Sequence, residues 1–580
     1  MATTGILRTR RSAAQLHALA SVERDIRATD RAPGRKYLRD FHDAYRSYQK
    51  VLTAANVRDE IAGAGIVLVG DYHALPNSQR YLASLLHDPA LHGRPLVLGV
   101  ETIFSRDQHI LDEWLRGEID ESELRERMRF DLDWGYDWTP FFELLSAARD
   151  HRAPIYGLDC MPREDMRKIG ARDRHAADKI VEMRHKHPDA LLLVLFGESH
   201  LAPQHLPALL DEKLSQEMPE ANAPERRVLT VLQNVDALYW NAAGEASDRV
   251  EAVEVSPRVF CVFNATPLEK YENYRLWLDR WGSDNDSAPD LGPTFYNLME
   301  GMVRFLGINQ YSPRNSTQPR LLVDLMPEVY SRSSDALLRR LLTRKGFTAA
   351  DRRSMLRRVR ERGSVYLAPL NAVYVRQFRM TWAAEDATRF LHQACRGLPY
   401  KSVPSRDVPN RGNKSSPQGL CSEDAFYRAV FEHALAFFGS RVLYPARPAF
   451  RDADLAELYE LTREDLEQQT GLPFADAVEA LDLLTHLRES ESRNCRRLGS
   501  SEPSEHPGAL PDCVAQALAF AGRKQEYVTE QLGYLAGNDL YDDYVAGLFT
   551  PNALRKLFLA HVDEAGVARA AYQQLRDRLR

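Results

Sequence analysis

The chain has 580 residues, of which 44% are hydrophobic and 27% are charged. This length exceeds what one hydrophobic core usually supports, so we expect at least two globular domains. The formal net charge of −6 leaves no basic footprint for nucleic acid, and the six cysteines are scattered without a C-x-x-C pair, which argues against a zinc ribbon or a disulfide framework.

The N-terminal region has basic residues, but no apolar stretch follows them. This pattern does not match a secretory signal peptide, and no run in the chain approaches the length of a membrane span. We therefore expect no membrane-spanning helix and a cytoplasmic location. Residues 1–54 are predicted to form N-terminal helices.

Residues 55–282 alternate between strand and helix patterns. The predicted strands are short, continuous apolar runs, which are typical of strands covered by helices on both faces. They lie at 66–69, 96–100, 155–158, 191–196, 228–233 and 259–263. The segments between them have helical periodicity. We therefore expect an α/β domain with a mostly parallel, doubly wound sheet and flanking helices.

Beyond a turn-rich linker at 282–293, this alternation stops and helical patterns dominate. We expect residues 294–580 to form a mainly α-helical region with polar loops near 401–419 and 489–508, where apolar residues are sparse. No repeat, metal motif or phosphate motif identifies its role. A protein partner, or a second copy of the chain in a homo-oligomer, would bind through this region.

Two of the predicted strands end in the same pattern, a glycine followed three residues later by a histidine. The first is G-D-Y-H, which ends at His73, and the second is G-E-S-H, which ends at His200. Two other strands end in a carboxylate, at Glu101 and Asp159. Since ligands bind outside the carboxyl ends of parallel strands in this kind of fold, we expect these side chains to share a site.

Taken separately, each of these features has an ordinary explanation. Glycine and histidine are common in loops, Glu101 could cap the following helix, and Asp159 could be a turn residue. Their coincidence at the ends of several strands of one sheet favours a functional site.

Two imidazoles and a carboxylate form a suitable ligand set for a divalent transition metal. His73, Glu101 and His200 are therefore the predicted metal ligands. A metal held in this way makes its bound water nucleophilic at neutral pH. A carboxylate outside the ligand set, Glu198 or Asp71, would then serve as general base.

The order of these motifs resembles the ChaN-like family, in the superfamily shared by Tiki-type proteases, TraB/PrgY proteins and erythromycin esterases. The resemblance rests on G-D-Y-H, V-E-T-I-F, P-I-Y-G-L, A-R-D-R-H-A-A-D-K-I and F-G-E-S-H-L, and it covers about residues 55–270. It implies that His73, Glu101, His200 and Arg172 belong to the site. The activities that it implies diverge, because Tiki-type members are metal-dependent peptidases, the esterase branch uses a histidine-centred site, and ChaN-like members bind haem or iron.

Two neighbouring side chains are further candidates. Arg172 could pair with a site carboxylate or bind an anionic group of a substrate. Tyr72 could bind a cofactor together with Asp71, or it could pack at the rim of the cleft. This chain departs from the haem-uptake pattern because it has no lipobox and adds a long helical region.

The leading expectation is a divalent-metal-dependent hydrolase that cleaves a peptide or ester bond in a small-molecule or peptide substrate. Its catalytic residues would be His73, Glu101, His200, Glu198 and Arg172. One alternative is a protein that binds haem or iron without turnover. A second alternative is a degenerate domain that serves as an interaction module.

Overall fold

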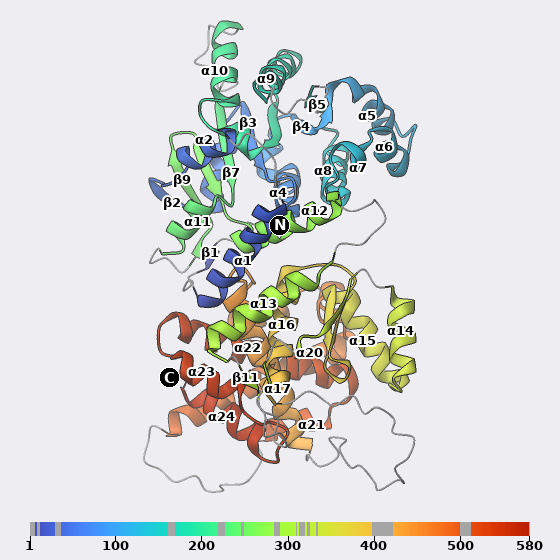
Figure 1. Ribbon diagram of the computed structural model, residues 1–580, viewed down its shortest axis with the longest axis vertical. Coiled ribbons are helices and arrows are strands. Elements are labelled where there is room, and N and C mark those ends of the chain that lie inside the picture. The colour runs from blue at the N-terminus through green and yellow to red at the C-terminus, as the bar shows by residue number, and fades with distance from the viewer. Residues whose placement is uncertain are drawn as a thin grey trace. The chain divides into compact units, whose positions relative to one another are not determined.

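The computed structural model describes residues 6–7, 12–29, 36–160, 169–217, 227–244, 249–282, 290–308, 310–311, 320–321, 325–331, 334–396, 422–498 and 512–578. The chain divides into two compact units, which are drawn in Figure 1. The first comprises Met1–Arg10 and Leu19–Asp290, and the second comprises Arg11–Ala18 and Leu291–Arg580. None of the described helices combines the length and the apolar character needed to cross a membrane.

The first unit is built on an eight-stranded sheet with the order β2-β9-β10-β7-β3-β6-β4-β5. Its strands are β2 (Lys50–Leu52), β3 (Ile66–Asp71), β4 (Leu96–Phe104), β5 (Ile155–Asp159), β6 (Leu191–Gly197), β7 (Val228–Gln233), β9 (Ala252–Ser256) and β10 (Val259–Val262). The six strands from β10 to β5 are parallel, whereas β9 and β2 extend the sheet in antiparallel pairing. The six parallel strands are those predicted from the sequence, so the expected α/β fold is confirmed.

Helices connect and cover these strands. They are α2 (Lys36–Ala44), α3 (Ala54–Ala62), α4 (Pro76–Leu86), α5 (Gln108–Leu115), α6 (Glu121–Arg127), α7 (Phe130–Asp133), α8 (Trp138–Asp150), α9 (Ile169–Lys186), α10 (Leu206–Glu217), α11 (Asp236–Ala242) and α12 (Pro267–Gly282). Helix α1 (Ala13–Thr29) precedes them in the chain, and its residues up to Ala18 belong to the second unit. β1 (Ile6–Leu7) and β8 (Arg249–Val250) form a separate two-stranded antiparallel sheet. Strands β1 and β2 lie within residues 1–54, where the sequence predicted N-terminal helices. Strands of two or three residues are too short to show an alternating pattern.

Alternate residues of the central strands enter two separate cores. Val67 and Val69 of β3 pack in one core with residues of α4 and α8. Ile66 and Leu68 pack in the other core with residues of α9 and α10. Because successive side chains of a strand point to opposite faces, a continuous apolar run is required where both faces are covered.

The second unit is mainly helical, as expected. Its helices are α13 (Gly292–Leu306), α14 (Asp335–Arg344), α15 (Ala349–Arg362), α16 (Met380–Arg396), α17 (Ser422–Leu443), α18 (Asp452–Glu457), α19 (Arg463–Thr470), α20 (Phe474–Leu498), α21 (Asp512–Ala519), α22 (Gly522–Val545), α23 (Pro551–Phe558) and α24 (Val567–Arg578). It also contains strands that we did not predict. β13 (Glu328–Tyr330), β15 (Ala372–Val375) and β14 (Ser364–Leu367) form a three-stranded sheet, and β11 (Gln310–Tyr311) pairs with β12 (Arg320–Leu321).

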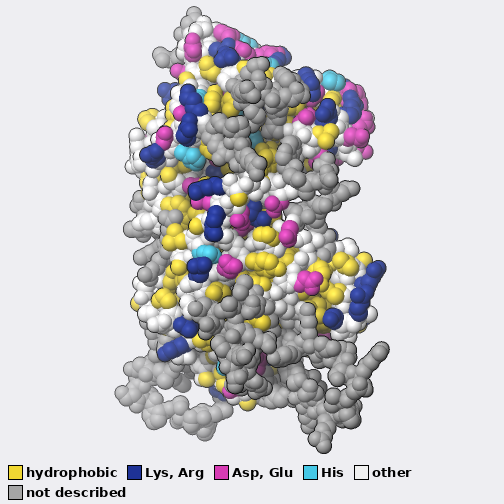
Figure 2. Space-filling view, in the orientation of Figure 1, with side chains coloured by type: hydrophobic (Ala, Val, Ile, Leu, Met, Phe, Trp, Pro, Cys, Tyr) yellow, Lys and Arg dark blue, Asp and Glu magenta, His cyan; other side chains and the backbone are white. Residues whose placement is uncertain are grey.

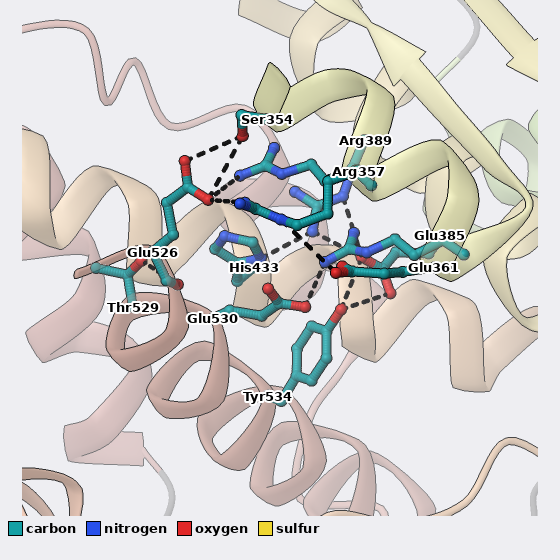
Figure 3. A network of polar contacts seen from close by, with 12 residues as sticks. Ser354, Arg357, Glu361, Glu385, Arg389, His433, Glu526, Thr529, Glu530 and Tyr534 are labelled. Atoms are coloured by element: carbon teal, nitrogen blue, oxygen red, sulfur yellow. Dashed lines mark hydrogen bonds and ion pairs between the residues drawn. The ribbon is translucent and has the colours of Figure 1, made fainter. Parts of the chain in front are cut away.

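A buried network of charged side chains links the helices of the second unit, and part of it is drawn in Figure 3. Its centre is Glu385 of α16, whose carboxylate accepts hydrogen bonds from Arg362 at 3.2 Å, Arg389 at 2.7 Å and Arg447 at 2.7 Å. The Tyr534 hydroxyl of α22 donates to the same carboxylate at 3.1 Å. Burial alone would raise the pKa of Glu385, but the three guanidinium groups hold it well below its usual range.

The structure describes only part of the two predicted polar loops. The first, 401–419, lies outside the described residues. In the second, 489–508, the expectation was wrong for residues 489–498, which continue helix α20 to Leu498. Glutamate, arginine and leucine in that stretch are good helix formers despite its polarity. Residues 499–508 lie outside the described residues.

Candidate functional site

Four adjacent strands place the sequence-predicted side chains at one edge of the sheet. His73 follows β3, and His200 lies in a 3₁₀ turn (Glu198–Leu201) after β6. Glu101 belongs to β4, and Asp159 is the last residue of β5. These strands are neighbours in the order β3-β6-β4-β5, so the four side chains come from one continuous part of the sheet.

Glu101 lies at an irregularity in β4. Pairing of β4 with β6 ends at Val100, and its register with β5 shifts between Val100 and Phe104. Such irregularities break the alternation of side chains and re-aim them, which is why they are frequent beside functional sites. Glu101 is consequently buried and directed toward the loops that follow β3 and β6.

Each carboxylate oxygen of Glu101 has one fixed donor and faces one imidazole. Oε1 accepts a hydrogen bond from Arg172 Nη2 at 2.5 Å and lies 3.9 Å from His200 Nε2. Oε2 accepts a hydrogen bond from the Gly197 N–H and lies 3.6 Å from His73 Nε2. Burial would raise the pKa of Glu101, but His73, Arg172 and His200 together lower it to about 2, so this carboxylate is ionised at neutral pH.

Both imidazoles are oriented by a second carboxylate. His73 Nδ1 is hydrogen-bonded to Asp71 Oδ2 at 2.7 Å, and His200 Nδ1 is hydrogen-bonded to Asp173. A carboxylate on Nδ1 places the proton there and turns Nε2 toward the other side of the ring. The site therefore consists of two Asp–His pairs whose Nε2 atoms face the same glutamate.

Arg172 pairs with site carboxylates, which was the first of its two predicted roles. Its Nε and Nη2 donate to the two oxygens of Asp159 at 2.9 Å each, and Nη2 also donates to Glu101. This forked geometry fixes the guanidinium plane and holds Glu101 in place. Asp159 thus acts on the site through Arg172.

Gly197 lies at the centre of this arrangement. A Cβ atom added to it would be 3.0 Å from Glu101 Oε2, 3.3 Å from His73 Nε2 and 3.4 Å from His200 Cδ2. Its φ of −50° is ordinary for any residue, so the glycine is needed for space and not for a tight turn.

Two other predicted site residues belong to a neighbouring cluster. Both oxygens of Glu198 accept hydrogen bonds from the buried Lys270, at 2.9 and 3.1 Å. Lys270 Nζ also lies over the Tyr72 ring, 4.5 Å from its centroid. Glu198 and Tyr72 are therefore both engaged with Lys270.

Sequence reasoning missed Asp173 and Lys270. Asp173 directly follows Arg172 in the R-D pair, and that position beside a predicted site arginine was the available signal. Lys270 lies in α12, remote in sequence from both histidine motifs, and no local pattern connects it with Glu198.

Two observations bear on the metal expected from the sequence. Among the described residues, no group of three or more His, Cys, Asp or Glu side chains is placed so that it could hold a metal ion. The guanidinium of Arg172 is bonded to Glu101, so a divalent cation bound to this carboxylate would meet a fixed positive charge.

The fold and the site define an α/β domain with a histidine–carboxylate centre at the carboxyl ends of a parallel sheet. Residues 57–192 match the family described as haem-binding uptake, Tiki superfamily, ChaN, which confirms the resemblance found in the sequence. No curated protein matches the chain.

Two solved structures are similar to part of the chain. One is that of ChaN of Campylobacter jejuni, described as showing cofacial heme binding, with 14% identity, coverage of 38% of this chain and 94% of that chain, and a TM-score of 0.25. The other is the C-terminal region of Pasteurella multocida toxin, described as having a thiol-protease like catalytic triad, with 12% identity, coverage of 38% of this chain and 30% of that chain, and a TM-score of 0.22.

Proposed function

We propose that the α/β domain is a hydrolase in which the two Asp–His pairs carry out acid–base catalysis on an ester or peptide bond. The observation that supports this most directly is that His73 and His200 are each held at Nδ1 by a buried carboxylate and turn Nε2 toward one glutamate. Imidazole is the side chain whose ordinary pKa is best matched to proton transfer at neutral pH.

In the proposed reaction, His73 is the general base. Its side chain is 14% exposed, against 7% for His200, so it is the imidazole that water reaches more readily. His73 Nε2 takes a proton from water as the water oxygen bonds to the carbonyl carbon. The Nδ1–H bond to Asp71 keeps the ring in the required tautomer.

His200 is the corresponding general acid. It gives a proton from Nε2 to the leaving oxygen or nitrogen as the bond to the carbonyl carbon breaks, so the products are a carboxylic acid and an alcohol or amine. The charge of Asp173 stabilises the imidazolium involved in this step. Glu101, with a pKa of about 2, is too weak a base to take the proton itself and instead places a negative charge within 3.6 and 3.9 Å of the two Nε2 atoms.

The experiment uses the purified full chain and a panel of chromogenic esters and peptides. We expect kcat/KM to fall about 100-fold or more in His73→Gln and His200→Gln, the usual loss when a general base or acid is removed. His151→Gln is the matched control, because His151 precedes β5 and so lies at the opposite end of the sheet. Full activity in both site variants, or hydrolysis of no substrate in the panel, would contradict the proposal.

The metal expected from the sequence is tested separately. We expect elemental analysis to find no stoichiometric transition metal, and dialysis against EDTA to leave turnover unchanged. Loss of turnover in EDTA with recovery on adding one metal would overturn the metal-free reaction and would make His73, Glu101 and His200 metal ligands instead.

Haem binding is a second candidate, because aromatic rings lie against His73. Its ring centroid is 5.6 Å from that of Trp134 and 5.2 Å from that of Tyr136, and Tyr136 stacks on Trp277 at 5.0 Å. Trp134 and Tyr136 are 1% and 8% exposed, so a flat macrocycle would stack beside His73 only after one of these rings moves aside. Haem titration that produces a Soret band in the unaltered chain, and a weaker band in Tyr136→Leu, would support this function; an unchanged haem spectrum would reject it.

A further inference from the structure

Helix α2 lies outside the family-matched segment but contacts the His200 side of the site. The Tyr37 hydroxyl of α2 donates to Asp173 Oδ2 at 2.9 Å, and Asp173 is the carboxylate that holds His200. The Tyr37 ring also meets the His200 ring edge to face, with centroids 5.5 Å apart. Tyr37 therefore contacts both members of one Asp–His pair.

Tyr37 is itself held in place by a second set of contacts. Its ring stacks on His205 at 3.7 Å with an interplanar angle of 8°. His205 Nε2 is hydrogen-bonded at 3.0 Å to Asp40 Oδ2, one turn along α2 from Tyr37. The Tyr37 ring is thus held by His205, which Asp40 holds in turn, and neither residue belongs to the reaction centre.

The other end of α2 contacts the 3₁₀ turn that carries His200, Glu198–Leu201. Tyr45, which directly follows α2, donates from its hydroxyl to the Leu201 carbonyl at 2.6 Å. Tyr45 therefore holds the backbone of the 3₁₀ turn that carries His200, whereas Tyr37 holds the carboxylate that orients the His200 ring. Tyr45 is therefore a matched control for Tyr37, because each phenol donates one hydrogen bond on the His200 side of the site but to a different group.

We propose that Tyr37 is a positioning residue that acts through Asp173 on His200, so that α2 completes the reaction centre. Asp173 bonds to His200 through Oδ1 and to Tyr37 through Oδ2, so the phenol fixes the rotation of the carboxylate about its Cβ–Cγ bond. The inference rests on the proposed hydrolase for its kinetic readout only.

The chemistry of Tyr37 is consistent with this role. Burial and the adjacent charge of Asp173 raise the pKa of the Tyr37 phenol well above its ordinary value. The phenol therefore stays protonated at neutral pH and can only donate to the carboxylate. Loss of such a supporting hydrogen bond usually reduces activity without removing any group that touches the substrate.

The test compares Tyr37→Phe with Tyr45→Phe in the full chain. The first readout is the ¹⁵N chemical shifts of the imidazole nitrogens in histidine-labelled protein at one pH, assigned with His73→Gln and His200→Gln. These shifts report which ring nitrogen carries the proton. We expect Tyr37→Phe to move the His200 shifts toward a mixture of tautomers, while the His73 shifts, set by Asp71, stay unchanged. Tyr45→Phe is expected to leave both sets unchanged.

The second readout is turnover. We expect Tyr37→Phe to lower kcat about tenfold, the lower end for loss of an outer hydrogen bond, with KM changed less than about twofold. Unchanged His200 shifts in Tyr37→Phe, or the same change in Tyr45→Phe, would overturn the assignment. If the unaltered chain hydrolyses nothing, the hydrolase proposal fails, but the nitrogen shifts still decide the role of Tyr37.

Discussion

Gly197 and Gly70 are the glycines of the two G-x-x-H motifs. Replacing each of them by alanine tests whether the space beside Gly197 belongs to the reaction centre. An added Cβ at Gly197 would lie 3.0 Å from Glu101 Oε2 and 3.3 Å from His73 Nε2, which is closer than comfortable contact. At Gly70 the nearest atoms, Glu198 Cβ and Leu201 Cδ1, are 3.5 Å away, an ordinary contact. Neither glycine has a positive φ, so the backbone accepts alanine at both positions.

The expected magnitudes follow from these distances. Gly197→Ala should cost about 1–3 kcal/mol of stability, as is usual for an added methyl group in a packed site. Either the imidazole or the carboxylate must shift by a few tenths of an ångström, and the methyl group occupies the space where water would meet His73. We expect kcat/KM to fall about 100-fold, since small misplacements of reacting groups have effects of this size.

The assay combines urea unfolding, followed by circular dichroism, with hydrolysis of the best chromogenic substrate. Gly70→Ala should keep its activity and gain up to about 1 kcal/mol of stability, because alanine restricts the unfolded chain. Equal activity in the two variants, or equal loss in both, would refute the reasoning that the reaction centre lies above Gly197.

Three further predictions concern buried charges. Arg172→Lys should lower both kcat/KM and the melting temperature, because lysine cannot reproduce the forked pair of hydrogen bonds to Asp159. The expected loss of folding stability is about 1–3 kcal/mol, and an unchanged melting curve would contradict this. Glu385→Gln should destabilise the second unit by about 3–5 kcal/mol, because Arg389 and Arg447 lose their charged partner, while Arg362 keeps Glu530. Tyr534→Phe should cost only about 1 kcal/mol; calorimetry of the full chain compares the two variants, and similar losses would argue against Glu385 as the centre of the network. Burial raises the pKa of Asp386 from 3.8 to about 6, so its contribution to stability is fully present below pH 3.8 and is lost as the pH rises through 6. Asp386→Asn should therefore gain stability relative to the unaltered chain between pH 4 and pH 7, by up to about 3 kcal/mol, and a difference independent of pH in urea unfolding would exclude this.

The parallel strands and the helical second unit could be predicted because their signals are local. A fully covered strand must be apolar at every position, and β3 and β6 meet that requirement from Ile66 and from Leu191 onward. The approach of His73, Glu101 and His200 could be expected from the rule that parallel strands share one carboxyl edge. The roles assigned to these residues remain proposals.

The remaining features depend on contacts between distant segments. Asp173 supports His200 from α9, Lys270 reaches Glu198 from α12, and Tyr37 reaches Asp173 from α2. No spacing within the chain encodes these meetings, which arise only when the helices pack on the sheet. The same holds for β2, whose three residues are ordered by antiparallel pairing with β9.

The central position of β3 has a consequence for dissecting the protein. In the complete sheet β3 pairs with β6 on one side and β7 on the other. A fragment limited to residues 57–192 would keep β3, β4 and β5, but it would lack β7 and most of β6. Both edges of an apolar strand would then be bare, and such edges recruit other chains and cause aggregation. The family-matched segment is therefore best expressed together with residues 36–56 and 193–282.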